Sequence, residues 1–244
     1  MAPQHDTIVV TGGSTGIGLA ICEHLLQQGH TVVNLSRRAA ELDHDGFHNI
    51  ELDLSDREAT AGVAADIAQR FQVTGFVHNA GLIRANLLEE VQLDDFDYLA
   101  QVHIGAAITL SQAFIPTMRE RQFGRIILIT SRAALGLQTR TSYSATKSGM
   151  MGMARTWALE LGDAGITVNT VAPGPIAATE MFHQVIPEND PKLDAMAQSI
   201  PVRRLGLPDD VARAVCFFND PANGFITGQT LMVCGGASLG SLAL

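Results

Sequence analysis

Residues 11–18 read Thr-Gly-Gly-Ser-Thr-Gly-Ile-Gly and directly follow the short apolar run Ile8–Val10. After them, apolar residues recur with a helical period over Ile17–Gln28, and Gly29 stands where such a helix would end. Glycines between a strand and a helix let backbone N–H groups approach a pyrophosphate closely, and the helix N-terminus adds its positive dipole end. This context predicts a phosphate-binding turn rather than an ordinary flexible one.

The alternation of short apolar runs and helical segments continues along the chain. Strands are predicted at Ile8–Val10, Thr31–Leu35, Asn49–Leu52, Gly75–His78, Arg125–Thr130, Thr167–Val171 and Thr230–Val233. Helices are predicted at Ile17–Gln28, Arg57–Phe71, Leu93–Arg121 (one helix or two), Tyr143–Leu161 and Pro208–Phe218. Continuous apolar strands are typical of a sheet covered on both faces, and repeated strand–helix–strand units form a parallel sheet.

We therefore expect an α/β fold: a Rossmann-like, doubly wound parallel sheet of about seven strands with helices on both faces. Residues 1–244 are predicted to form one dinucleotide-binding domain. Only residues 177–204 interrupt the alternation for long, and they contain Pro187, Pro191 and Pro201. This segment predicts an inserted loop or short helices that serve as a substrate lid.

Composition excludes some classes of protein. The chain is 46% hydrophobic and 17% charged, which argues against disorder. Lys plus Arg is 16 and Asp plus Glu is 25, a net charge of −9, which argues against nucleic acid as a partner. The three cysteines show no CxxC spacing, so we expect reduced thiols and no metal site. The chain starts without a signal-peptide pattern and no apolar run approaches about 20 residues, which predicts a cytoplasmic protein that does not enter a membrane.

The end of the second predicted strand reads Asn34-Leu35-Ser36-Arg37-Arg38. In dinucleotide-binding sheets a carboxylate at this place binds the ribose 2′-hydroxyl, whereas arginine accommodates a 2′-phosphate. The stretch holds no carboxylate, and guanidinium groups bind phosphate oxygens in pairs. We therefore expect NADP in preference to NAD, the alternative being that both arginines are solvated surface charges.

A second constellation lies further along the chain. Tyr143 and Lys147 are four residues apart, so they share one face of the predicted helix. A nearby ammonium favours the phenolate and so lowers the pKa of the tyrosine toward neutrality. Ser131 follows a predicted strand at its carboxyl end, where open α/β sheets place their chemistry. These three groups predict a site where a carbonyl oxygen is held and protonated.

Together these segments resemble the short-chain dehydrogenase/reductase family, in the single-domain branch that includes 3-oxoacyl-carrier-protein reductases. The resemblance spans nearly the whole chain. It is carried by TGGSTGIG (11–18), Asp53-Leu54, His78-Asn79-Ala80-Gly81, YSATK (143–147), NTVAPG (169–174), LGLPDDVA (205–212) and ITGQ (226–229).

The resemblance implies a carbonyl reductase that uses NADP(H) to interconvert a carbonyl and a secondary alcohol. Tyr143 would be the general acid or base, Ser131 would orient the carbonyl, and Lys147 would bind the nicotinamide ribose. The cofactor contacts it implies are Gly12, Ser14, Thr15, Gly16, Ile17, Gly18, Ser36, Arg37, Arg38, Asp53, Leu54, Asn79, Ala80, Gly81, Tyr143, Lys147, Pro173, Gly174, Ile176 and Thr179. It also implies a homotetramer or homodimer assembled through residues 94–121 and 143–161.

The chain departs from the family pattern in three places. His103 stands where the family has a catalytic asparagine that positions a proton-relaying water; it either replaces that asparagine, which would make activity pH-sensitive, or is structural. Ser131 is one residue nearer to Tyr143 than is usual, so Thr130 is the alternative. The segment 175–179 is one residue longer than usual, and Thr179 is the predicted contact to the nicotinamide carboxamide.

The sequence indicates less about the substrate than about the cofactor. Arg84, Arg132 and Arg140 fall in predicted pocket segments and are either ligands of an anionic substrate group or solvated charges. Met181, Phe182, Ile186 and Met196 either cover an apolar substrate or pack on the sheet. A nucleotide-binding regulator or redox sensor of the same fold is the alternative to an enzyme, and His103 is the one feature that favours it.

Overall fold

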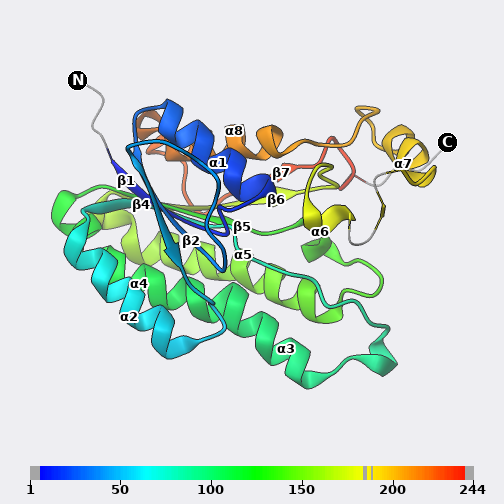
Figure 1. The fold of residues 1–244 in the computed structure, drawn as a ribbon, viewed down its shortest axis with the longest axis horizontal. Helices are drawn as coiled ribbons and strands as arrows, with labels where there is room; N and C mark the ends of the chain where they lie inside the picture. The colour runs from blue at the N-terminus through cyan, green and yellow to red at the C-terminus, as the bar shows by residue number, and fades with distance from the viewer. Residues whose placement is uncertain (1–5, 184–185, 188, 240–244) are drawn as a thin grey trace.

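The computed structural model describes residues 6–183, 186–187 and 189–239. Its centre is one sheet with the strand order β3-β2-β1-β4-β5-β6-β7, and all neighbouring strands are parallel (Figure 1). The strands are β1 (Thr7–Thr11), β2 (Thr31–Ser36), β3 (Phe47–Glu51), β4 (Val73–His78), β5 (Gly124–Ile129), β6 (Ile166–Pro173) and β7 (Thr230–Val233). The strand order reverses direction between β1 and β4, which confirms the doubly wound topology.

Helices cover both faces of the sheet. Helices α1 (Gly16–Gln27) and α8 (Pro208–Asn219) lie on one face, and α2 (Arg57–Arg70), α4 (Ala106–Arg121) and α5 (Thr141–Leu161) lie on the other (Figure 1). The buried side chains accordingly form two main clusters. In β1, Ile8 and Val10 belong to one cluster and Val9 to the other, because successive side chains of a strand point to opposite faces. Double coverage is thus the reason that the strands read as continuous apolar runs.

Several strand boundaries differ from those predicted. Strand β3 covers Phe47–Glu51, so it begins two residues and ends one residue before the predicted limits. It lies at the edge of the sheet and alternates exposed and half-buried residues, so it carries little apolar signal. Strand β4 begins at Val73 rather than Gly75, and β5 covers Gly124–Ile129 rather than Arg125–Thr130.

The predicted helical segment Leu93–Arg121 contains α3 (Leu93–Ala100), a π-helical turn (Gln101–Gly105) and α4. An 18-residue window of this segment has a mean hydropathy of 1.2, so by length and composition alone the segment could cross a membrane. Half of its most apolar window is buried inside the fold, as in the core helix of a globular protein. Leu110 and Phe114 of α4 belong to the core, so the segment is apolar because it packs on the sheet.

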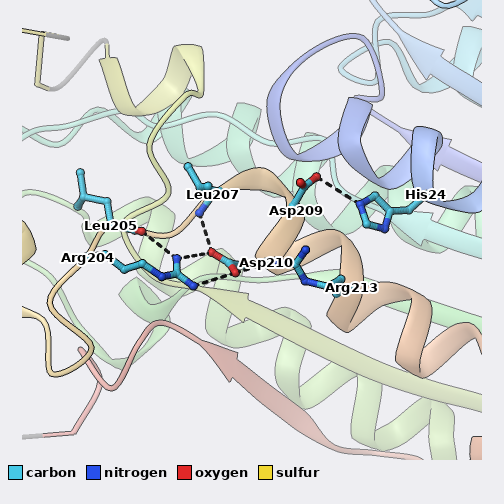
Figure 2. Close-up of polar contacts among 7 residues, drawn as sticks. All are labelled: His24, Arg204, Leu205, Leu207, Asp209, Asp210 and Arg213. Atoms are coloured by element: carbon cyan, nitrogen blue, oxygen red, sulfur yellow. Dashed lines mark hydrogen bonds and ion pairs between the residues drawn. The ribbon is translucent and has the colours of Figure 1, made fainter.

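Residues 177–204 contain two short helices, α6 (Glu180–His183) and α7 (Lys192–Ser199); residues 184, 185 and 188 lie outside the described part. Figure 2 shows how the end of this segment is anchored to α8. Arg204 donates two hydrogen bonds to Asp210 at 2.6 and 3.0 Å, and Asp210 accepts a third from the Leu207 N–H at 2.9 Å. Asp209 contacts His24 of α1 at 3.3 Å, so α8, α1 and the segment 204–207 are joined.

Candidate active site

The carboxyl ends of the central strands open into a cavity of about 1070 Å³. Apart from His103, all of the predicted catalytic and cofactor-binding residues line it. They are Gly12, Ser14, Thr15, Gly16, Ile17, Gly18, Ser36, Arg37, Arg38, Asp53, Leu54, Asn79, Ala80, Gly81, Ser131, Tyr143, Lys147, Pro173, Gly174, Ile176 and Thr179. The fold therefore brings together residues that are more than 160 positions apart in the chain (Gly12 and Thr179, for example).

The glycine-rich turn lines this cavity where α1 begins. Gly12 and Gly16 have φ of 69° and 56°, a conformation that other residues rarely adopt. A Cβ on Gly18 would lie 2.0 Å from the Gly12 carbonyl oxygen, so the helix can approach the turn only if residue 18 has no side chain. This open, close-packed backbone fits the pyrophosphate of a dinucleotide.

Asn34 holds the turn against β2, a role that the sequence did not predict. Its buried Oδ1 accepts hydrogen bonds from the Gly13 N–H at 2.8 Å and the Ser36 hydroxyl at 2.7 Å. Its Nδ2 donates to Asn49 at 2.9 Å. The Ser36 hydroxyl is thus already engaged by Asn34, although Ser36 lines the cavity.

We expect Gly18→Ala to destabilise the protein and to abolish cofactor binding, because its methyl group would overlap backbone that cannot move aside. The melting temperature should fall by several degrees, which corresponds to about 1–3 kcal/mol. Gly62→Ala is the matched control: Gly62 is exposed in α2, and an added methyl group there would have no neighbour within 4 Å. This change should stabilise by about 0.5–1 kcal/mol. Equal melting temperatures for both variants would contradict the prediction.

The two arginines after β2 differ in their contacts. Arg38 forms an ion pair with Glu180 of α6 and lies 3.5 Å from the Thr15 hydroxyl. Arg37 is exposed, and its charge helps to lower the pKa of Asp53, although hydrogen bonds from Ser55 lower that pKa more. The pairing of Arg38 with Glu180 spans 142 positions and had no signal in the sequence.

The segment after β4 is held by the Thr11 hydroxyl. This oxygen accepts hydrogen bonds from the N–H groups of Asn79 and Ala80, both at 3.0 Å, and contacts His78 Nδ1 at 3.0 Å. His78 is fully buried, and burial together with the charge of Lys147 lowers its pKa to about 3. A neutral His78 therefore donates from Nε2 to the Val102 carbonyl at 3.1 Å. This network ties the turn, β4 and the π-helical turn together.

Ser131, Tyr143 and Lys147 also line the cavity. The Ser131 side chain acts to lower the pKa of Tyr143, whereas the Thr130 hydroxyl donates to the Val171 carbonyl at 3.2 Å within the sheet. These contacts favour Ser131 over Thr130. Lys147 Nζ lies 5.8 Å from the centre of the Tyr143 ring and donates to the Ile129 carbonyl at 2.8 Å.

Burial is the largest influence on the pKa values of Tyr143 and Lys147. Desolvation raises the pKa of Tyr143 above its usual value, while the hydrogen bond with Ser131 and the charge of Arg140 act in the opposite direction. Lys147 is not among the causes of this shift, so its expected effect on the pKa of the tyrosine stays a prediction. Burial lowers the pKa of Lys147 itself from 10.5 to about 7, so near neutral pH it is only partly an ammonium.

His103 lies in the π-helical turn and is fully buried. Its Nε2 accepts the Leu82 N–H at 3.2 Å, so Nδ1 carries the proton and donates to the Thr146 hydroxyl at 2.9 Å. Burial lowers the pKa of His103 well below its usual value, and its ring packs edge-on against Tyr143 with centroids 5.7 Å apart. Both nitrogens are engaged and the ring stays neutral, which favours the structural alternative over a pH-sensitive relay.

The segment after β6 closes one wall of the cavity. The Thr179 hydroxyl donates to the Ile176 carbonyl and accepts the Phe182 N–H, both at 3.2 Å, so it holds the start of α6. A Cβ on Gly16 would lie 3.2 Å from the Thr179 methyl group. The geometry thus puts Thr179 beside the turn that Gly16 belongs to.

The substrate end of the cavity is lined by the three predicted arginines and by the lid residues. Arg84 pairs with Asp95 at 3.2 Å, whereas Arg140 is buried beside Tyr143. The lining residues that were predicted are Arg84, Arg132, Arg140, Met181, Phe182, Ile186 and Met196. Those not predicted include Tyr98, Glu180, Gly236, Ala237 and Leu239, whose positions depend on contacts between distant segments.

Known proteins resemble this chain over nearly its whole length. A sequence model of the family described as Enoyl-(Acyl carrier protein) reductase matches residues 12–238. The (2S)-[(R)-hydroxy(phenyl)methyl]succinyl-CoA dehydrogenase subunit BbsD of Thauera aromatica is 36% identical over 98% of this chain and 99% of its own. The 3-oxoacyl-[acyl-carrier-protein] reductase FabG of Haemophilus influenzae is 35% identical over 97% of this chain and 99% of its own.

The chain belongs to the short-chain dehydrogenase/reductase family. A solved short-chain dehydrogenase/reductase family protein matches with a TM-score of 0.88 and 32% identity over 98% of this chain and 99% of its own. A putative NAD(P)-dependent gluconate 5-dehydrogenase from Beutenbergia cavernae, with bound NADP, matches with a TM-score of 0.86 and 30% identity over 96% and 97%. The protein is accordingly an NAD(P)-dependent oxidoreductase that interconverts carbonyl and alcohol groups, and the alternative of a regulator is not favoured.

Proposed function

We propose that this short-chain dehydrogenase/reductase is an NADP(H)-dependent carbonyl reductase with Tyr143 as its general acid and base. The observation that carries the proposal is that one continuous cavity is lined by the glycine turn and by Tyr143 with Ser131. When bound, NADPH supplies the hydride that is transferred to the carbonyl carbon.

The chain's own residues supply position and protons. The Ser131 hydroxyl donates to the carbonyl oxygen, and the Tyr143 hydroxyl protonates this oxygen as its negative charge develops. The raised pKa of Tyr143 keeps that hydroxyl protonated at neutral pH, as reduction requires. Lys147 Nζ, with a pKa of about 7, takes up and releases a proton near neutrality and so can resupply the tyrosine. His103 holds Leu82 and Thr146 and is a positioning residue.

The cofactor site fits NADP. Arg37 and Arg38 line the cavity after β2 and both side chains are exposed, so their guanidinium groups can turn to a 2′-phosphate. Arg38 would leave Glu180 to do so. The relatives support this choice, because the gluconate 5-dehydrogenase structure that matches the chain holds NADP.

Replacing both Arg37 and Arg38 by alanine should raise the KM for NADPH by about a hundredfold or more, because each charge-assisted hydrogen bond contributes about 1.5–3 kcal/mol. The KM for NADH should change by no more than about threefold, since NADH has no 2′-phosphate. Initial rates with one ketone and both cofactors measure this, and Arg70→Ala on α2 is the control for loss of a surface charge. A wild-type preference for NADH would overturn the assignment.

The proposal includes the domain, the lid, the location and the oligomeric state of the protein. Residues 1–244 act as one domain, and residues 177–204 act as the substrate lid over the cavity. We expect a cytoplasmic homotetramer or homodimer with no membrane or nucleic-acid partner. Leu159 on α5 is 88% exposed, which leaves an apolar side chain free for a second subunit. On the same helix, Met150 and Ala154 belong to the core instead, with Met153 and Trp157 packed partly against it.

A further inference from the structure

We propose that Arg140 forms an anion-binding subsite beside Tyr143, and that the substrates are ketones or alcohols with a carboxylate close to the reacting carbon. The inference rests on the proposed function, because it takes Tyr143 as the residue that meets the carbonyl oxygen. It names a substrate class that the fold alone does not determine.

Arg140 is buried, with 8% of its surface exposed, and it lines the cavity. Its Nη1 donates to the Thr139 hydroxyl at 2.6 Å and to the Thr139 carbonyl at 3.3 Å. Among the described residues, no carboxylate lies within ion-pair distance of its guanidinium. A buried charge without a counter-charge is costly, and a bound anion would remove that cost.

Among the described residues around Tyr143, no acidic side chain neutralises the charge of Arg140. Of the described residues that line the cavity, only Asp53 and Glu180 are acidic. Neither is free to neutralise Arg140: Asp53 follows β3 and accepts hydrogen bonds from Ser55, and Glu180 pairs with Arg38. Arg84 is different from Arg140, since Asp95 already neutralises it at 3.2 Å and half of its side chain is exposed.

The backbone holds Arg140 in place at a conformational cost. Thr139 has φ of 64°, which is unfavourable for a β-branched residue. The Thr139 carbonyl accepts the Asn86 N–H at 3.1 Å, and Asn86 pairs with Arg140 as an isolated β-bridge. Such strain persists only where the surroundings enforce it, and it concentrates at ligand clamps.

The position of Arg140 sets where the anion would lie. Arg140 immediately precedes α5 and is three residues before Tyr143, so both lie on one face of the chain at the first turn. The charge of Arg140 is felt at the phenol, because it acts to lower the pKa of Tyr143 against the larger effect of burial. A carboxylate bound by Arg140 would therefore lie near a carbonyl held by Tyr143, which suits 2-oxo and 3-oxo acids.

The test compares acids with neutral partners of the same shape. A panel of 2-oxo and 3-oxo acids with methyl, branched alkyl and phenyl substituents is assayed with NADPH against the corresponding methyl esters. We expect the wild-type enzyme to favour at least one acid by about tenfold or more in kcat/KM, and Arg140→Gln to reduce that ratio by about tenfold or more, mainly through KM. Arg140→Lys should retain part of the preference, and Arg84→Gln should change the ratio by less than about twofold.

Binding is measured separately from turnover by calorimetry. The enzyme saturated with NADPH, which cannot react with an alcohol, is titrated with 3-hydroxybutyrate and with 3-hydroxybutyramide, and with the hydroxy acid and amide pairs that match the rest of the panel. At least one acid should bind the wild type about tenfold more tightly than its amide, and Arg140→Gln should bind the two equally. Thermal unfolding of each variant confirms that it is folded.

Two results would overturn the subsite: wild-type enzyme that does not distinguish any acid from its neutral partner, or an acid preference that Arg140→Gln leaves unchanged. Ester reduction that depends on Tyr143, without acid preference, would refute the subsite and keep the proposed function. Acid-selective binding that Arg140→Gln removes, without NADPH oxidation by any ketone, would support the subsite and refute the proposed function.

Discussion

Tyr143→Phe should reduce kcat for ketone reduction by about 10²–10⁴-fold and leave the fold intact. The hydroxyl that protonates the carbonyl oxygen is lost, and general acid catalysis contributes about that factor. The ring, which is buried against His103 and Leu99, is retained. Initial rates with NADPH measure the loss, and the unfolding temperature confirms the fold.

Tyr98→Phe is a matched control, since Tyr98 lines the same cavity and the chain has only these two tyrosines. It should keep kcat within about threefold. The raised pKa of Tyr143 also predicts that alcohol oxidation, which needs the phenolate, keeps accelerating as pH rises, without levelling off below pH 10. If Tyr143→Phe kept more than about a tenth of kcat, the proton donor would have to be another group.

Lys147→Met should inactivate the enzyme and yet stabilise it relative to wild type most strongly at neutral and lower pH. Burial lowers the pKa of Lys147 from 10.5 to about 7, so between these values the unfolded chain binds a proton that the folded chain does not. The stability of the wild type therefore rises with pH in this window, by up to about 1.4 kcal/mol per pH unit, and is lowest below about pH 7. Methionine carries no such penalty.

Unfolding of both proteins in denaturant at about pH 7 and about pH 10 checks this. The stability difference in favour of Lys147→Met should shrink by a few kcal/mol over that range. Lys192→Met at the exposed start of α7 removes the same charge from the surface and should show no comparable trend. If the difference in unfolding free energy between Lys147→Met and wild type were the same at both pH values, the buried amine would stay protonated. That result would contradict the lowered pKa of Lys147.

The sequence predicts best the strands in which nearly every residue is buried. The strands around Val9, Val33 and Val168 are covered by helices on both faces, so each strand has buried apolar residues on both of them. The resulting apolar runs are what predicted the sheet. The edge strand β3 has fewer apolar residues, and its predicted limits differ from those in the structure. The glycine turn was predictable because a strand, a turn and a helix adjoin in sequence.

What the sequence did not predict comes from contacts between distant segments. Asn34 holds Gly13 across 21 positions, and Arg38 pairs with Glu180 across 142. The pKa of Lys147 depends on the side chains that exclude water from it, which no spacing reveals. The contacts of His103 with Leu82 and Thr146 likewise join three segments, so the choice between a relay and a structural role needed the fold.

The reversal of strand order between β1 and β4 also separates two kinds of evolutionary change. Strands β1 to β4, from the first third of the chain, end beside the residues proposed for the phosphates and adenosine; β5 and β6 lead to Ser131, the Tyr143 helix and the lid. Mutations that alter nucleotide choice and mutations that alter substrate choice therefore fall mostly in different stretches of the gene, and the ion pair between Arg38 and Glu180 of the lid is one place where the two kinds meet. A lineage with this topology can acquire new substrates while it keeps one coenzyme.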